Sequence, residues 1–146
     1  MSAQKLPHQY QIVANAQQDG DIDLAGEGIP TLKTNAPAQF GGPGDQWSPE
    51  DLLVGSVADC FILTFRAIAR ASKLDWVNLE CVTEGTLERI ERVTQFTSFN
   101  IQAKLTVNSD IDPEKALKLL EKAESNCLIT NSLKASTHLQ TEVVVQ

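Results

Sequence analysis

The chain has 146 residues, of which 42% are hydrophobic, enough for one domain with a core of its own. It carries 12 basic and 19 acidic side chains, and the formal net charge of -7 repels the phosphate backbone of nucleic acids. We therefore expect one domain over residues 1–146 and no nucleic-acid partner. The polar stretch Met1–Tyr10 has neither the apolar run of a signal peptide nor a membrane span, which predicts a cytoplasmic protein without a membrane partner.

The first part of the chain is predicted to be β-structure followed by a long irregular connection. Gln9–Ala14 is expected to be a strand, Asp19-Gly20 a turn, and Asp21–Leu24 the returning strand of a hairpin. Gly26–Trp47 is rich in glycine and proline, so we expect an irregular connection with one short strand near Thr31–Thr34. A connection of this length in a compact domain is usually functional or held by a partner.

A long helix is predicted to begin at Ser48-Pro49-Glu50-Asp51. Serine is a favoured N-cap, proline suits the first helical position, and the two acids face the positive end of the helix dipole. The helix is expected to run to about Lys73. The residues that recur at three- and four-residue spacing along one broad side are Leu52, Leu53, Ser56, Val57, Cys60, Phe61, Thr64, Phe65 and Ile68. This pattern is typical of a central buried helix.

The remainder is predicted to contain strands, a second helix and a final strand. Glu80–Leu87 and Gln95–Val107 alternate with period two, apart from a charged stretch between them, and are expected to be antiparallel strands. The side chains predicted to share one face are Val82, Leu87, Phe99, Ile101, Ala103, Leu105 and Val107. Asp112 caps a second helix that is expected to end at Cys127, and Thr137–Val145 is the last strand. The order predicts an α+β domain with mostly antiparallel sheets around two central helices.

Three cysteines are the candidates for chemistry. Cys60 and Cys127 lie on the apolar sides of the two predicted helices, and either one alone is more often a small buried hydrophobe. Together they could react in sequence, because a thiolate that attacks a peroxide becomes a sulfenic acid and a second thiol converts this to a disulfide. Cys81 lies in a predicted strand and is expected to be structural. Since the chain contains neither a C-x-x-C motif nor a His/Cys cluster, no metal site is predicted.

Two segments of the chain resemble the osmotically inducible protein C and organic hydroperoxide resistance family. Gly41-Gly42, Ser48-Pro49-Glu50-Asp51-Leu52-Leu53 and Ala58-Asp59-Cys60-Phe61 are similar to the stretch around that family's peroxidatic cysteine. Cys127-Leu128-Ile129-Thr130-Asn131-Ser132-Leu133 is similar to its resolving-cysteine segment. The order of elements is similar across almost the whole chain.

The resemblance implies an intertwined homodimer with two active sites at the subunit interface. It implies reduction of organic hydroperoxides without a metal, haem or flavin cofactor, with recycling by an external dithiol. Cys60 would be the peroxidatic thiolate, Cys127 the resolving thiol, and Glu50 a carboxylate that orients a cation near Cys60. From its position on the helix, Phe61 is a candidate to line an apolar substrate pocket, although an aromatic residue beside a helix is more often part of the core.

The chain departs from the hydroperoxide resistance branch at one residue of chemical importance. That branch uses an arginine from the N-terminal strands to lower the thiol pKa, whereas no arginine precedes Arg66 here. Lys33, in the N-terminal β-region, is the expected replacement cation, although an ammonium cannot form the bidentate pair of a guanidinium. Two alternatives stay open: Glu50 serves only the helix dipole, and the protein is a non-catalytic, ligand-binding or redox-sensing member of the fold.

Overall fold

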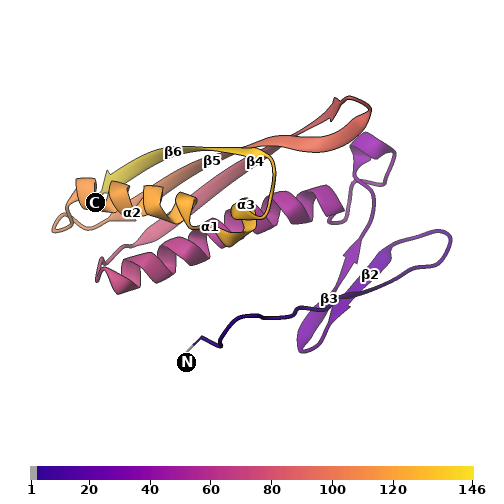
Figure 1. Ribbon diagram of the computed structural model, residues 1–146, viewed down its shortest axis with the longest axis horizontal. Helices are drawn as coiled ribbons and strands as arrows, with labels where there is room; N and C mark the ends of the chain where they lie inside the picture. Colours follow the sequence, from indigo (N-terminus) through magenta and orange to yellow (C-terminus); the bar gives the residue numbers. More distant parts are fainter. Residues whose placement is uncertain (1–2) are drawn as a thin grey trace. The chain divides into compact units, whose positions relative to one another are not determined.

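The structure is a computed structural model that describes residues 3–146. The chain divides into two compact units, one ending at Leu52 and one running from Leu53 to Gln146 (Figure 1). The single domain expected from the sequence thus consists of two units, and each is described by itself.

The first unit contains a three-stranded antiparallel sheet in the order β1-β2-β3. Its strands are β1 (Val13–Asn15), β2 (Ile22–Gly26) and β3 (Ile29–Thr34). The predicted hairpin is present, but its first strand is displaced toward the C-terminus, because Gln9–Ile12 form no ladder. A short 3-10 helix, η1 (Ala38–Phe40), follows.

The long connection after β3 is closed on itself by hydrogen bonds. The amide of Asn35 donates to the carbonyl of Trp47 at 2.9 Å, and its side-chain amide donates to Asp21 at 2.9 Å. Gly42 is required in this loop, since a Cβ atom there would lie 1.8 Å from the carbonyl oxygen of Ala36. These contacts bring the chain back to the sheet just before the long helix begins.

Helix α1 (Pro49–Ala71) begins where the sequence predicts. The Ser48 hydroxyl accepts a hydrogen bond from the Asp51 amide at 3.0 Å, and the Ser48 amide donates to the Asp51 carboxylate at 3.1 Å. This reciprocal pair satisfies two backbone donors at the helix start. The helix ends two residues before the predicted Lys73, which has a left-handed φ of 55°, and the Leu74 amide donates to the Ala69 carbonyl at 2.9 Å. The end is therefore a Schellman motif.

The second unit is built on a three-stranded sheet in the order β4-β5-β6. Its strands are β4 (Asn78–Ile90), β5 (Val93–Val107) and β6 (Ser136–Val145). β4 and β5 form an antiparallel hairpin, whose turn residues Glu91 and Arg92 both have positive φ. The charged stretch Glu88–Arg92, which was expected to interrupt the strands, therefore lies at the end of one long hairpin. Its first three residues belong to β4, and Glu91 and Arg92 form the turn. β6 pairs with β5 in parallel, so this sheet is mixed.

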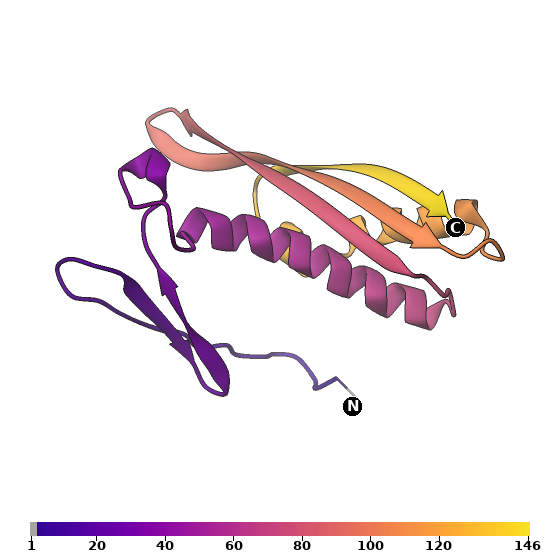
Figure 2. The same cartoon turned by 180° about the vertical axis from the view of Figure 1, so that it is seen from behind.

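The core of the second unit lies on one face of this sheet, where the helices pack (Figures 1 and 2). The predicted inward face of β5 is confirmed, since Phe99, Ile101, Ala103, Leu105 and Val107 are all buried. The prediction for β4 was wrong at Val82, which is 53% exposed, whereas Leu87 is half-buried. The register pairs Cys81 with the buried Ala103, which places Leu79, Cys81 and Thr83 on the core side.

Two helices separate β5 from β6, namely α2 (Pro113–Ser125) and α3 (Leu128–Asn131). The Asp112 carboxylate accepts from the Glu114 amide at 3.0 Å, which confirms the predicted start of α2. Its predicted end was wrong. The helix closes at Asn126, whose amide donates to Lys122 at 3.1 Å, and Cys127 is the extended N-cap of α3. Cys127 therefore does not continue the apolar side of α2.

Helix α1 is less buried in the single chain than its sequence predicts. Four residues spaced one turn apart are fully buried: Val57, Phe61, Phe65 and Ala69. Leu63, on the opposite side, is 51% exposed. By length and composition α1 is the one helix among residues 3–146 that could cross a membrane. Core helices of soluble proteins can have the same length and apolar composition. In this structure, the four buried residues pack α1 against the sheet.

Candidate active site

The structure brings two of the predicted site residues together within the second unit. Cys60 lies in the middle of α1, immediately before the buried Phe61, and its side chain is half-buried. Cys127 is fully buried at the start of α3. Cys60 and Cys127 lie near enough for each thiol to affect the pKa of the other. Both are free thiols, and their pairing as a disulfide stays a prediction.

The surroundings of Cys60 favour its ionised form. Burial opposes ionisation and is the largest single effect, but four hydrogen bonds act against it. In order of size these come from the backbone of Ile129, the Cys127 thiol, the Thr64 hydroxyl and the backbone of Leu128. Together they outweigh burial and lower the pKa of Cys60 below its ordinary value. The Thr64 oxygen lies 3.8 Å from the Cys60 sulfur.

The surroundings of Cys127 have the opposite effect. Burial raises the pKa of this thiol, and the hydrogen bond and the negative charge of Cys60 raise it further, whereas the backbone and hydroxyl of Thr130 act in the other direction. The hydroxyl of Thr130 is itself held by the Cys127 carbonyl, to which it donates at 3.2 Å. The two thiols are therefore shifted in opposite directions, with Cys127 the harder of the two to ionise.

Cys81 does not share this environment. It lies on the core side of β4, where its sulfur contacts the Thr83 hydroxyl at 3.5 Å. Burial raises the pKa of Cys81, and the charge of Cys127 adds to the effect. The predicted structural role agrees with this position, since a thiol with a raised pKa is a poor nucleophile near neutral pH. Among residues 3–146, no group of three or more His, Cys, Asp or Glu side chains is placed to hold a metal ion.

Glu50 and Lys33, the other predicted polar residues of the site, belong to the first unit. Glu50 lies in the first turn of α1, and its Oε1 atom is buried without a hydrogen-bond partner among residues 3–146. Because α1 continues unbroken through Gly55, Glu50 and Cys60 lie about 15 Å apart along the helix axis. Any influence of Glu50 on the thiol must therefore pass through a cation or a second subunit.

Lys33 has a partner within its own hairpin. Its ammonium lies 3.1 Å from the carboxylate of Asp23, which faces it directly across the β2–β3 ladder. Both side chains are largely exposed, so this ion pair contributes little to stability. Its role as the cation near Cys60 stays a prediction.

Phe61 takes the core position that is the commoner alternative for an aromatic residue on a helix. Its side chain is 0% exposed and belongs to the hydrophobic core of the second unit. A hydroperoxide could reach the ring only if this packing opened, so burial supports a core role. Sequence reasoning missed Thr64 as a partner of the thiol. The spacing of four residues from Cys60 on a predicted helix was the available signal, because such residues are neighbours on a helix surface.

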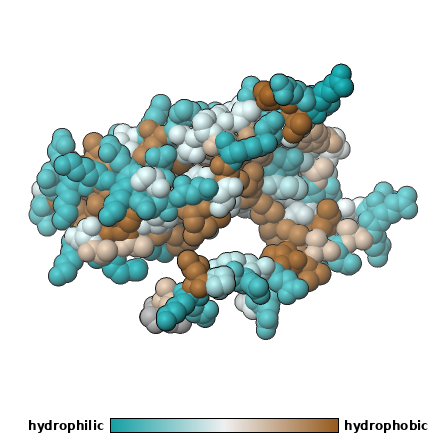
Figure 3. Space-filling model, viewed as in Figure 1, coloured by the Kyte–Doolittle hydropathy of each residue, from teal (hydrophilic) through white to brown (hydrophobic). Residues whose placement is uncertain are grey.

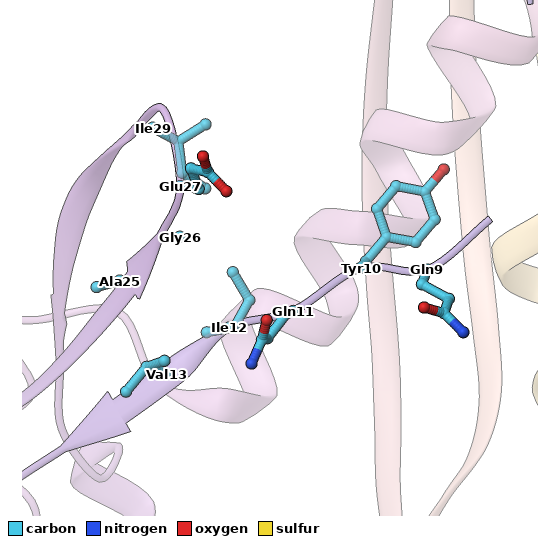
Figure 4. A pocket seen from close by; sticks show the side chains of 9 residues that line it. All are labelled: Gln9, Tyr10, Gln11, Ile12, Val13, Ala25, Gly26, Glu27 and Ile29. Carbon is cyan, nitrogen blue, oxygen red and sulfur yellow. The ribbon is translucent and has the colours of Figure 1, made fainter. Parts of the chain in front are cut away.

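A hollow of about 990 Å³ lies within the first unit and contains none of the cysteines. It is lined by the segments Gln9–Val13 and Ala25–Ile29, with the side chains of Tyr10, Ile12 and Ile29 around it (Figure 4). Tyr10 is 88% exposed, so the hollow is an open apolar surface of the N-terminal hairpin. The reactive groups of the molecule lie elsewhere, at the two thiols.

Fold and site together define an α+β protein with two neighbouring thiols, one with a lowered pKa and one with a raised pKa. The family model described as OsmC-like protein matches residues 42–142, which include both cysteines. The chain belongs to this family. The resemblance found in the two sequence segments is thus confirmed.

Known proteins and solved structures agree with this assignment. The uncharacterized protein YmaD of Bacillus subtilis is 27% identical over 143 residues, which cover 95% of each chain. The structure of an OsmC-like protein of unknown function from Vibrio cholerae matches with a TM-score of 0.84 at 14% identity, covering 92% of this chain and 99% of that one. The structure of an organic hydroperoxide resistance protein OsmC from Legionella pneumophila matches with a TM-score of 0.74 at 20% identity, covering 96% and 99%. At these identities the structural matches establish the fold.

The opposite pKa shifts predict which cysteine is alkylated first. With limiting iodoacetamide near pH 7.5, we expect modification at Cys60 ahead of Cys81 and Cys127, because only the pKa of Cys60 is lowered and its side chain is part-exposed. The Cys60 rate should rise with pH around a midpoint below the ordinary cysteine value. Peptide mass spectrometry over a pH series checks this, with Cys60→Ser as the control. Faster labelling of Cys81 would contradict the assignment of Cys60 as the nucleophile.

Proposed function

We propose that this protein is a thiol-dependent peroxidase that reduces organic hydroperoxides. The observation that carries the proposal is the contact between Cys60 and Cys127, in which the half-buried thiol has a lowered pKa and the buried thiol a raised one. A lowered pKa supplies the thiolate needed to attack a peroxide, and a neutral thiol within reach supplies the second step.

The reaction balances with the two thiols alone. The Cys60 thiolate attacks the terminal oxygen of a hydroperoxide, the O–O bond breaks, and the alkoxide leaves as an alcohol after taking up a proton. Cys60 is then a sulfenic acid. The Cys127 sulfur attacks the Cys60 sulfur, a disulfide forms and water leaves. An external dithiol reduces this disulfide by exchange and is itself oxidised. No further cofactor enters the proposed cycle.

An organic hydroperoxide suits the surface around Cys60. Leu128, whose backbone hydrogen-bonds the Cys60 sulfur, has a side chain that is 66% exposed. Leu63 lies one turn along α1 from Cys60 and is 51% exposed. Apolar side chains beside a reactive thiol favour substrates that carry an alkyl or aryl group. The Legionella protein of the same fold is called an organic hydroperoxide resistance protein, which agrees with this substrate class.

A homodimer in the cytoplasm is the proposed working form. The apolar helix α1 leaves Leu63 exposed, and the N-terminal hairpin exposes Tyr10, Ile12 and Ile29. Apolar surface is visible in the space-filling view (Figure 3). Exposed apolar surface of this extent is costly in a monomer and typical of a subunit interface. The second subunit is also a possible source of the partner that the buried Glu50 oxygen lacks among residues 3–146.

A redox-sensing role without turnover is the alternative. It is favoured by the missing arginine and by the Lys33–Asp23 pair, which gives the lysine a partner of its own. The same two thiols would then form a disulfide that signals oxidation instead of completing a cycle.

Cysteine variants separate the two steps. In stopped-flow mixing with cumene hydroperoxide and with hydrogen peroxide, we expect faster oxidation by the organic peroxide and turnover with a dithiol such as dihydrolipoamide. Cys60→Ser should abolish the reaction, because no thiolate remains. Cys127→Ser should react once and accumulate a sulfenic acid that dimedone traps. Cys81→Ser is the matched control and should turn over as the unmodified protein does. Oxidation that proceeds equally in Cys60→Ser would overturn the proposal.

The oligomeric state is tested by light scattering. At micromolar concentration, we expect a mass twice that of the 15.9 kDa chain. Ile12→Asp together with Ile29→Asp should shift this toward a less stable monomer, because a charge on a buried interface is costly. An exposed position such as Gln17→Asp is the control. A stable, folded monomer for the unmodified chain would contradict the dimer.

Lys33 is tested as the cation by replacing it with methionine. Lys33→Met should slow peroxide reduction about ten-fold or more, corresponding to about 1.4 kcal/mol of lost stabilisation, and raise the thiol pKa. Lys5→Met is a control for the loss of one positive charge. An unchanged thiol titration and rate in Lys33→Met would remove Lys33 from the site and shift the balance toward the sensing alternative.

A further inference from the structure

The Thr64 hydroxyl occupies a position of chemical interest that neither the sequence patterns nor the family assignment gives it. Thr64 follows Cys60 by one helical turn on α1 and is half-buried. Its oxygen lies 3.8 Å from the Cys60 sulfur, within the range of a hydrogen bond to sulfur. A helical threonine commonly bonds the carbonyl one turn back. Here the hydroxyl contacts the side chain of that earlier residue.

The direction of this hydrogen bond depends on the ionisation of Cys60. With a neutral thiol, either the sulfur or the hydroxyl can be the donor. A thiolate has no proton, so only the Thr64 hydroxyl can then donate. Hydrogen bonds to a charged acceptor are roughly twice as strong as neutral ones. The contact is therefore stronger in the ionised state than in the neutral state.

We propose that Thr64 is a further catalytic residue, whose hydroxyl donates to the Cys60 thiolate and so sustains the reactive form of the thiol. Its catalytic meaning rests on the proposed function, in which Cys60 is the attacking thiol. The direction of the Cys60 pKa agrees with this, since the Thr64 hydroxyl is among the groups that lower it. Because Thr64 lies one turn from Cys60 on the same helix, the backbone of α1 holds its hydroxyl beside the sulfur. No loop is needed to place this donor.

The groups that face Cys60 from other elements limit how the proposal is tested. From α3, the backbone of Leu128 and Ile129 and the thiol of Cys127 contact the sulfur. From β4, the titratable Cys81 lies near enough to Cys127 for the charge of Cys127 to raise the Cys81 pKa. The charged neighbours on α1, Asp59 and Arg66, have exposed side chains. Titrations are therefore best made in a Cys81→Ser background, which leaves the Cys60–Cys127 contact intact.

The test replaces the hydroxyl while keeping the shape of the side chain. In Thr64→Val, alkylation of Cys60 by iodoacetamide at pH 7 should slow about three- to ten-fold, the effect expected from one hydrogen bond. At pH 10 the rate should approach that of the parent protein, because the thiol is then ionised in both. Thr64→Ser retains the hydroxyl and should stay close to the parent. Thr83→Val, which removes a half-buried threonine hydroxyl on β4 whose contact is with residue 81 and not with Cys60, is the matched control.

Two results would overturn the proposal. One is a Thr64→Val rate at pH 7 equal to the parent rate, and the other is an equal loss at pH 7 and pH 10, which indicates displaced packing. If Thr64→Val does not fold, Thr64→Ala supplies a second variant without the hydroxyl. The assay uses no peroxide, so the two proposals fail separately. A protein inert toward hydroperoxides but with a pH-dependent loss in Thr64→Val would retain the hydroxyl's role and reject the peroxidase.

Discussion

The packing of α1 against the β4–β5–β6 sheet is the constraint that fixes the reactive thiol. Val57, Phe61, Phe65 and Ala69 form one row of fully buried side chains along the helix. Each step of four residues keeps this row on the sheet, because an α-helix repeats every 3.6 residues. Cys60 immediately precedes Phe61, so it lies at the border of the row and not within it. The contact that buries Phe61 therefore holds Cys60 half-buried, in contact both with the protein and with solvent.

That position decides how the thiol is activated. Burial alone would raise the pKa of Cys60. Hydrogen bonds from the start of α3 and from Thr64 outweigh this effect, so the pKa is lowered. A hydrogen bond to a charged group is worth about 1.5–3 kcal/mol, so a few of them can offset the loss of water around a partly exposed thiolate. These donors are neutral. They lower the Cys60 pKa although no arginine precedes Arg66 in the chain.

Much of the fold could be predicted because local signals and the core agree. Three predicted features depend only on neighbouring residues, and the structure contains all of them. These are the Ser48 cap, the Asp112 cap and the alternation of buried residues in β5. The family resemblance, which rests on the residues around Cys60 and Cys127, is confirmed by the matching family model.

Other features depend on register and on contacts between distant segments, which a linear pattern does not specify. Val82 looked apolar and inward-facing, but the pairing of Cys81 with Ala103 turns it outward. The end of α2 was missed because only Asn126 and Cys127 separate it from α3, and no proline or glycine marks the boundary. For the site, sequence could nominate the two cysteines. The sequence could not predict that backbone groups of α3 lie near Cys60, because every residue type has the same backbone amide.

The central claim is that Cys60 and Cys127 form one redox pair. The most direct test is to treat the reduced protein with one equivalent of cumene hydroperoxide, block the remaining thiols and map the disulfides by peptide mass spectrometry. A Cys60–Cys127 bridge requires Cα atoms within about 7 Å in the oxidised protein. The account predicts this bridge as the main product, with Cys81 recovered as a free, blocked thiol. A main disulfide that contains Cys81, or oxidation that leaves Cys60 and Cys127 both reduced, would contradict it.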